Sequence, residues 1–337
     1  MNYFGTLYSH EALQLHHIRF LIAKLAVLAM NPISLQKNNS LRPHFPLPRI
    51  PDRARLALYA QLARVDRPIG TLLLLWPTLG ALWIAAEGTP TPHLLLVFVL
   101  GVFLTRSGGC VINDYVDRDL DGGVERTRHR PLAAGRVTPS EALTLAALLF
   151  CLAFLLVLTT NRLTVLLAFV GAVLAAIYPF MKRITWVPQF FLGLAFGWGI
   201  PMAFAAQTGA VPPVAWLLYM ANILWAMVYD TLYAMVDRND DLRLGVRSTA
   251  ILFDDADTTI IGIMQIMRLA LLTLIGVKQE LAYHYYFGIV LSGVQFLAHQ
   301  FLIRDRSREG CFRAFMLNNW VGLTLFAAIA LALGTPA

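Results

Sequence analysis

Long runs of apolar residues, each close to the length of a membrane-spanning helix, dominate this chain of 337 residues. A helix needs roughly 20 predominantly apolar residues to cross the hydrocarbon core of a bilayer. Hydrophobic residues make up 58% of the chain and charged residues only 14%, a balance that no water-soluble core requires. The sequence therefore predicts an all-α integral membrane protein. We place about nine spans at residues 69–87, 93–115, 141–160, 163–181, 187–207, 213–235, 257–277, 284–303 and 314–334.

Glycine and proline residues are expected to interrupt this pattern. Residues 88–92 break the chain after the first span, and the proline pair at 212–213 opens the sixth. Gly197, Gly199 and Pro201 lie inside the fifth span. Because proline removes a helical hydrogen bond and glycine weakens the helix, we expect this span to be kinked.

The basic residues between the spans predict the orientation of the chain, because short cytoplasmic loops carry an excess of lysine and arginine. The loops after the first, third, fifth and seventh spans contain only Arg162 and Lys278. The loops after the other spans contain Arg118, Arg126, Arg128, Arg130, Arg136, Lys182, Arg183, Arg238, Arg243, Arg247, Arg304, Arg306, Arg308 and Arg313. We therefore expect the N-terminus in the cytoplasm and the C-terminus outside. The net charge of +7 then reflects topology and not a nucleic-acid partner.

The first 50 residues differ in character from the rest of the chain. They contain one acidic residue, Glu11, and a weakly apolar stretch at 18–30, with no clear cleavage site of the kind that follows a secretory signal. We expect a dispensable or poorly ordered N-terminal extension at 1–50, with Met30 as an alternative start and a mitochondrial presequence as the alternative interpretation. The arginine-rich residues 51–67 predict an amphipathic helix on the cytoplasmic interface, and 51–337 form the membrane domain.

The hexapeptide Val-Asp-Arg-x-x-Asp occurs twice, at 116–121 and at 236–241, each time at the end of an apolar run. Two carboxylates four residues apart lie on one face of a helix. Charge at such a depth is expensive and is usually kept for a purpose. A solvated loop cap would explain one copy, but it does not explain two copies with the same spacing. We infer that the two motifs share a functional site.

Each motif extends along its helical face. The first face carries Arg106, Asn113, Asp117 and Asp121, and the second carries Asp230, Tyr233, Asp237 and Asp241. Asp114, Asp119 and Asp240 fall off these faces and are weaker candidates. Arg106 lies within the second span, so it should point into the protein or a polar cavity. It either neutralises the nearby carboxylates or binds a substrate directly.

Carboxylate and amide oxygens without paired histidines or cysteines favour Mg²⁺ over Zn²⁺. Basic residues in neighbouring loops can complete a diphosphate site, namely Arg126, Arg128, Arg130, Lys182 and Arg183. A diphosphate at the cytoplasmic interface, attached to a group that belongs in lipid, suggests a polyprenyl diphosphate. Metal and basic side chains would stabilise the departing diphosphate. Its loss leaves an allylic cation that an electron-rich acceptor attacks without any protein nucleophile.

At these residues the chain resembles the UbiA superfamily of intramembrane prenyltransferases. The pattern Asn113-Asp114-x-x-Asp117-x-x-x-Asp121 looks like its first signature, and Asp230-x-x-Tyr233-Ala234-x-x-Asp237-x-x-Asp240-Asp241 looks like its second. The resemblance covers residues from about 60 to 335. The segments 66–70, 76–77, 106–110, 178–183 and 318–322 resemble the 4-hydroxybenzoate polyprenyltransferase branch of that family.

The resemblance implies helices around a central cavity with cytoplasmic loops that cap it. It implies Mg²⁺ and diphosphate on four catalytic carboxylates, those of Asp117, Asp121, Asp237 and Asp241. Arg183 would contact diphosphate as a further catalytic residue, and Asn113 would assist. Arg67 would bind the acceptor carboxylate or the phosphate. The other candidates for substrate binding are Lys182, Arg106, Arg126 and Tyr233.

The expected function is Mg²⁺-dependent transfer of a polyprenyl group to the ring carbon ortho to the hydroxyl of 4-hydroxybenzoate, in ubiquinone biosynthesis. The expected location is a bacterial inner membrane, surrounded by lipid, with the mitochondrial inner membrane as the alternative. Within the family, the acceptor could instead be a naphthoate, haem, a tetrapyrrole or a glycerol phosphate. A cation-coupled transporter would bind nearer the membrane midplane. A non-catalytic scaffold would tolerate neutral residues in place of the acidic pairs.

Overall fold

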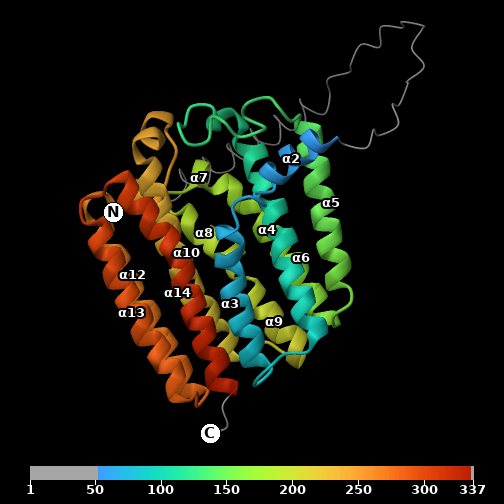
Figure 1. Cartoon of the computed structure of the whole chain (residues 1–337), viewed down its shortest axis with the longest axis vertical. Coiled ribbons are helices and arrows are strands. Elements are labelled where there is room, and N and C mark those ends of the chain that lie inside the picture. Colours follow the sequence, from blue (N-terminus) through green and yellow to red (C-terminus); the bar gives the residue numbers. More distant parts are fainter. Residues whose placement is uncertain (1–51, 335–337) are drawn as a thin grey trace, which may run out of the picture. The chain divides into compact units, whose positions relative to one another are not determined.

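The computed structural model describes residues 52–334, and the expectations for 1–50 lie outside that range. Within the described range the chain is helical, with no β-strand (Figure 1). The helices are α2 (Arg53–Leu62), α3 (Ile69–Ala85), α4 (Pro92–Asp121), α5 (Pro139–Val157), α6 (Arg162–Ile177), η1 (Tyr178–Phe180), α7 (Met181–Ile184), α8 (Pro188–Gly197), α9 (Gly199–Thr208), α10 (Pro213–Leu244), α11 (Thr249–Phe253), η2 (Asp254–Ala256), α12 (Asp257–Lys278), α13 (Tyr283–Ile303) and α14 (Arg308–Gly334).

The predicted spans coincide with helices, and the expected all-α membrane architecture is confirmed. In the described part of the chain, seven helical segments are long and apolar enough to cross a membrane by length and composition. They are 92–121, 139–157, 162–184, 188–208, 249–278, 283–303 and 308–334. The first predicted span is α3, a shorter apolar helix of 17 residues. The sixth is α10, which has 32 residues, includes the second acidic motif and is not among the seven segments. The predicted count of nine spans is therefore approximate.

The fifth span is kinked, as predicted. Helix α8 ends at Gly197 and α9 begins at Gly199. Pro201 in the first turn of α9 has no amide hydrogen to continue the α8 hydrogen-bonding pattern. A Cβ atom on Gly197 would lie 2.9 Å from the ring of Tyr219 on α10. The glycine therefore lets α8 approach α10 closely at the kink, as small residues do between membrane helices.

The predicted interfacial helix at 51–67 is shorter than expected and is not free on the surface. Helix α2 ends at Leu62, which is fully buried. Arg64 then has a left-handed backbone conformation, with φ of 58°, which a helix cannot contain. The Arg55 guanidinium donates from Nε to Oε1 of Glu141 on α5 at 2.8 Å. Basic residues that we expected at the interface thus fasten α2 to the rest of the domain.

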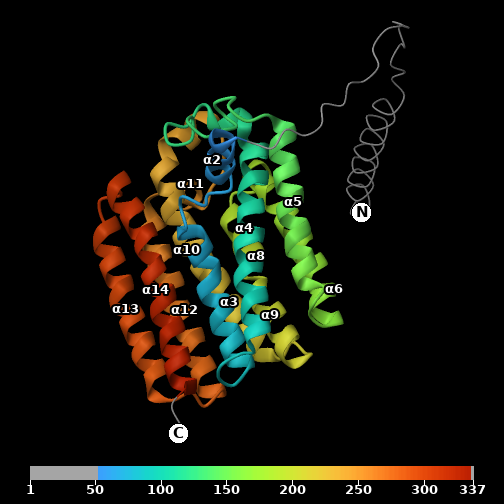
Figure 2. The same cartoon turned by 45° about the vertical axis from the view of Figure 1, so that its right-hand side comes forward.

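The long helices run side by side, and the ends of α4 and α10 that carry the two acidic motifs lie at one end of the domain, beside α2, α7 and α11 (Figures 1 and 2). The end of α14 lies at the opposite end. The interior is well packed around α10, where Trp225 and Leu232 are among the most deeply buried side chains. A Cβ atom on Gly322 of α14 would lie 2.7 Å from Trp225, so the two helices meet closely there. This packing fixes α10 in the middle of the domain.

Candidate active site

A cavity of about 1130 Å³ lies between the helices at the end that carries both acidic motifs. Asp117 and Asp121 of α4 line it, and so do Asp230, Asp237 and Asp241 of α10. The connection between α4 and α5, residues 122–138, crosses this end of the domain, and we call it the cap loop (Figure 1). The expectation that the two motifs face one chamber is confirmed.

The first motif is organised around Asp117, whose side chain is 3% exposed. Asn113 donates from Nδ2 to Asp117 Oδ2 at 3.1 Å, which is the interaction expected from their spacing of four residues. Lys182 of α7 forms an ion pair with the same carboxylate oxygen. Lys182 also lines the cavity, so its ammonium group can reach a bound anion there.

Arg183 has a different position from its neighbour Lys182. It is not part of the cavity lining. It donates to Asp117 Oδ1 at 3.4 Å and to the backbone carbonyl of Val116 at 2.8 Å. Of the two basic residues on α7, Lys182 is therefore the better placed for a ligand in the cavity, while Arg183 supports the Asp117 carboxylate through its other oxygen.

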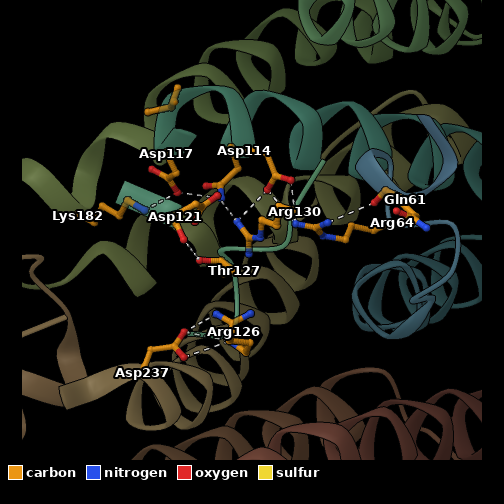
Figure 3. A network of polar contacts seen from close by, with 12 residues as sticks. Gln61, Arg64, Asp114, Asp117, Asp121, Arg126, Thr127, Arg130, Lys182 and Asp237 are labelled. Carbon is orange, nitrogen blue, oxygen red and sulfur yellow. Dashed lines mark hydrogen bonds and ion pairs between the residues drawn. The ribbon is translucent and has the colours of Figure 1, made fainter. Parts of the chain in front are cut away.

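The second motif meets the cap loop through Arg126. Its guanidinium donates from Nε to both carboxylate oxygens of Asp237 at 3.1 Å and forms an ion pair through Nη2 (Figure 3). It also donates to the hydroxyl of Tyr233 and lies over the Tyr233 ring, 4.2 Å from its centroid. Between residues 52 and 334, no basic side chain lies within ion-pair distance of Asp230 or Asp241. Among the described residues, Arg126 is therefore the single basic partner of the second-motif carboxylates that line the cavity, while Asp240, outside the lining, pairs with Arg308.

Asp114 belongs to the site, although its helical position made it a weaker candidate. Its side chain is 2% exposed and pairs with two arginines. Arg64 donates to both of its carboxylate oxygens at 2.9 Å, and Arg130 donates to its Oδ1 at the same distance. Arg130 also donates to Asp121 Oδ2 at 2.9 Å (Figure 3). The spacing of four residues could not reveal this role, because it depends on the turn after α2 folding over that side of α4.

Two arginines of the cap loop stay charged despite their burial. Burial opposes the charge of Arg130, but Asp114 and Asp121 raise its pKa above the ordinary value. Burial likewise opposes the charge of Arg126, while Tyr233 and Asp237 raise its pKa. Both groups therefore remain available as cations at any physiological pH.

The donor chemistry of the cavity fits Mg²⁺ better than Zn²⁺. Carboxylate oxygens and amide side chains line a single space, and these are groups that Mg²⁺ prefers. Within residues 52–334, no three acidic, histidine or cysteine side chains already converge closely enough to hold a metal. Instead, Asp117, Asp121 and Asp237 accept hydrogen bonds from basic side chains. The oxygens for a metal site are present, and each of these three carboxylates forms an ion pair with a basic side chain of the protein.

Arg106 lies deeper in the cavity, in the membrane-spanning part of α4. A Cβ atom on Gly70 of α3 would lie 2.4 Å from Arg106 Nη2, so the glycine makes room for the guanidinium. In the described part of the chain, Arg106 Nε and Nη1 have no hydrogen-bond partner and no carboxylate lies within ion-pair distance. The interpretation that Arg106 neutralises nearby carboxylates is therefore wrong. Arg67 also lines the cavity, but its side chain is 67% exposed beside Asp66.

The cavity also has an apolar wall along α14. Phe312, Met316 and Trp320 line it and are 42%, 40% and 55% exposed. Helix α3 packs beside α14 and contributes Ile69 and Leu73 to the same lining. The charged chamber thus continues into a part of the cavity with apolar walls, which suits a ligand with a polar head and an apolar chain.

The sequence model of the UbiA prenyltransferase family matches residues 74–332, which include both acidic motifs. The chain belongs to the UbiA prenyltransferase family. It is similar to the 4-hydroxybenzoate octaprenyltransferases of Marinobacter nauticus, at 57% identity over 281 residues, and Aeromonas hydrophila, at 56% over 273 residues. These alignments cover 83% and 81% of this chain, and 96% and 95% of the two relatives. This UbiA protein is therefore a prenyltransferase and an integral membrane protein.

Solved structures of UbiA homologues share the fold. A homologue from Aeropyrum pernix K1 has a TM-score of 0.69 at 24% identity, covering 78% of this chain and 97% of that one. A homologue from Archaeoglobus fulgidus bound to GPP and Mg²⁺ has a TM-score of 0.65 at 16% identity, covering 81% and 99%. At these identities the likeness establishes the arrangement of helices around the cavity.

Proposed function

We propose that this UbiA enzyme transfers a polyprenyl group from polyprenyl diphosphate to the ring carbon ortho to the hydroxyl of 4-hydroxybenzoate, as a step of ubiquinone biosynthesis. The observation that carries the proposal is a single cavity that both acidic motifs line, together with basic side chains and apolar residues of α3 and α14. Relatives at 57% identity are 4-hydroxybenzoate octaprenyltransferases, which supports this acceptor. The proposed location is a bacterial inner membrane with the N-terminus in the cytoplasm, or else the mitochondrial inner membrane.

The paired charges of the cavity suit a substrate that arrives with its own cation and anion. The carboxylates of Asp117, Asp121, Asp237 and Asp241 would hold Mg²⁺. Mg²⁺ would supply positive charge that stabilises the departing diphosphate. The homologue from Archaeoglobus fulgidus binds GPP together with Mg²⁺, which supports this pairing of ligands.

The basic side chains would take the diphosphate. Lys182, Arg126 and Arg130 line the cavity and now contact the carboxylates. When these carboxylates turn to a divalent cation, the same ammonium and guanidinium groups can donate to phosphate oxygens, with little uncompensated charge in either arrangement. Asn113 and Tyr233 would orient the two motifs through their contacts with Asp117 and Arg126.

Bond cleavage between the allylic carbon and the diphosphate oxygen leaves a carbocation and free diphosphate. The ring carbon ortho to the phenol attacks the cation, because the hydroxyl directs electron density to that position. The ring proton then passes to an aspartate of the cavity or to the released diphosphate, which restores aromaticity. The chain would position the reactants and exclude water, and no protein nucleophile takes part.

Arg106 is the side chain best placed for the acceptor. Its guanidinium has two unpartnered nitrogens and lies deeper in the cavity than the diphosphate-binding groups. A carboxylate such as that of 4-hydroxybenzoate would satisfy it through paired hydrogen bonds. Arg67, at the exposed side of the lining, is the alternative partner for this carboxylate or for phosphate.

A product assay with membranes that contain the enzyme tests the proposal. Labelled polyprenyl diphosphate is offered with 4-hydroxybenzoate, a naphthoate, haem or a glycerol phosphate, and the prenylated product is identified. We expect prenylated 4-hydroxybenzoate, formed only with Mg²⁺ present. A product with another acceptor alone would refute the proposed substrate, and full turnover in EDTA would remove the metal from the mechanism.

A further inference from the structure

A second arginine, Arg268, lies inside the protein and does not line the candidate active site. It is in the middle of α12, about 15 Å from either end of the helix at 1.5 Å per residue, and is only 3% exposed. Its guanidinium carbon lies 4.5 Å from the centre of the Trp225 ring and 5.7 Å from that of Phe296. These rings offer a partial cation–π interaction, but they do not accept its in-plane hydrogen bonds.

The charge of Arg268 has no counter-ion among the described residues. Across residues 52–334, no carboxylate lies within ion-pair distance of it, and its Nε and Nη1 atoms have no hydrogen-bond partner. An arginine side chain does not lose its proton in proteins. A buried charge that is neither paired nor hydrogen-bonded is strongly unfavourable, most of all within a bilayer. The structure therefore requires a partner for this group.

A small cavity of about 30 Å³ adjoins Arg268. Asn222 of α10 lines it as well, is 5% exposed, and has an Oδ1 atom without a hydrogen-bond partner. The other walls are mainly apolar and include Trp76 and Trp225, whose indole nitrogens already donate to Asn319 and Asn318. This cavity shares no lining residue with the large chamber. It is a separate site with room for one or two particles of water size.

We propose that this cavity binds a small monovalent inorganic anion, such as chloride, on Arg268. Water would accept hydrogen bonds from Arg268 but would leave its charge uncompensated. A halide would accept the hydrogen bonds and also compensate the charge. Rotation of the Asn222 amide exchanges Oδ1 for Nδ2 and offers the anion a second donor. The bound anion would join α3, α10, α12 and α14, the four helices that supply most of the lining, beneath the active site.

Halide-dependent stability of the purified full-length protein in detergent tests this proposal. Unfolding midpoints are compared in sodium chloride, sodium bromide and sodium gluconate at equal ionic strength. Because a ligand of the native state raises the midpoint by mass action, we expect chloride and bromide to raise it by about 3 °C relative to gluconate. Arg268→Met should abolish this difference. Lys278→Met, which removes an exposed cation from the same helix, should retain it.

Equal midpoints of the unmodified protein in chloride and gluconate would overturn the proposal, and so would a full halide effect in Arg268→Met. If that variant does not fold, bromide soaked into crystals of the unmodified protein decides the question. An anomalous peak beside Arg268 supports the anion site. If no anomalous peak appears beside Arg268 and water density is found there instead, the cavity is only hydrated and the proposal is refuted.

Discussion

The two acidic motifs share one hexapeptide pattern but have different surroundings in the folded protein. On α4, Asp114, Asp117 and Asp121 each pair with at least one cation, and these come from the turn after α2, the cap loop and α7. On α10, Asp237 pairs with Arg126 of the cap loop, and Asp240, which does not line the cavity, pairs with Arg308 of α14. Asp230 and Asp241 line the same cavity without an ion pair to the described residues.

This difference indicates that the same spacing serves two purposes. The first motif ties three separate segments to α4 and so also holds the cap of the cavity in place. The second motif leaves carboxylates available to a ligand that brings its own positive charge. The cap loop connects the two, because Arg126 contacts the second motif and Arg130 contacts the first.

The largest expected effect tests what the motifs have in common. Asp117→Asn and Asp237→Asn should each lower kcat for prenyl transfer by at least about 100-fold, the scale for loss of one electrostatic stabiliser of a transition state. The turnover rate of each variant in membranes with saturating Mg²⁺ measures this loss of kcat. Asp119→Asn is the matched control, since Asp119 is 81% exposed, and should retain activity. Near-normal turnover of either motif variant would separate that motif from the chemistry.

The next effect distinguishes the motifs by stability. Asp114→Asn leaves Arg64 without its carboxylate and deprives Arg130 of one of two, so it should lower the free energy of unfolding by about 3 kcal/mol. Asp241→Asn removes a carboxylate that has no ion pair and should change stability by less than about 0.5 kcal/mol. Denaturation of the two purified variants in detergent compares them. Equal destabilisation would mean that the first motif has no special structural role.

A smaller expected effect, on KM for the acceptor, tests whether the acceptor binds at a place separate from the two acidic motifs. Arg106→Gln should raise KM for 4-hydroxybenzoate by about tenfold or more, the loss of one charge-assisted contact, and leave KM for polyprenyl diphosphate nearly unchanged. Initial rates with each substrate varied in turn measure the two constants. Arg118→Gln, on the exposed surface of the same helix, is the control. A rise in KM for the diphosphate alone would place Arg106 with the motifs.

The smallest effect concerns the N-terminal extension. The family model matches residues 74–332, so deletion of residues 1–50 should leave kcat and both KM values within about twofold. Activity per amount of membrane-inserted protein measures this. A large loss of kcat at normal insertion would mean that the extension supplies part of the site.

Much of the fold and half of the site could be predicted from local sequence patterns. The apolar runs determine the helices, and residues four apart share a face whatever surrounds the helix, so the Asn113–Asp117 contact follows from spacing alone. The fifth-span kink follows from backbone chemistry at Pro201 and its glycines. The length of α2 was mispredicted, because the turn at Arg64 is stabilised by its pairing with Asp114, 50 residues away in the chain.

The sequence by itself determined that the chain lies in a membrane, that it is helical, and that two matched acidic faces end two of its helices. Only the tertiary structure decided which cation serves which carboxylate, because Arg126 and Asp237 are 111 residues apart and meet only when the cap loop crosses the cavity. It also decided that Arg106 and Arg268 have no acidic partner in the part of the chain that the structure describes. Helical periodicity acts over a few residues, whereas charge pairing depends on distances in space that no local pattern contains.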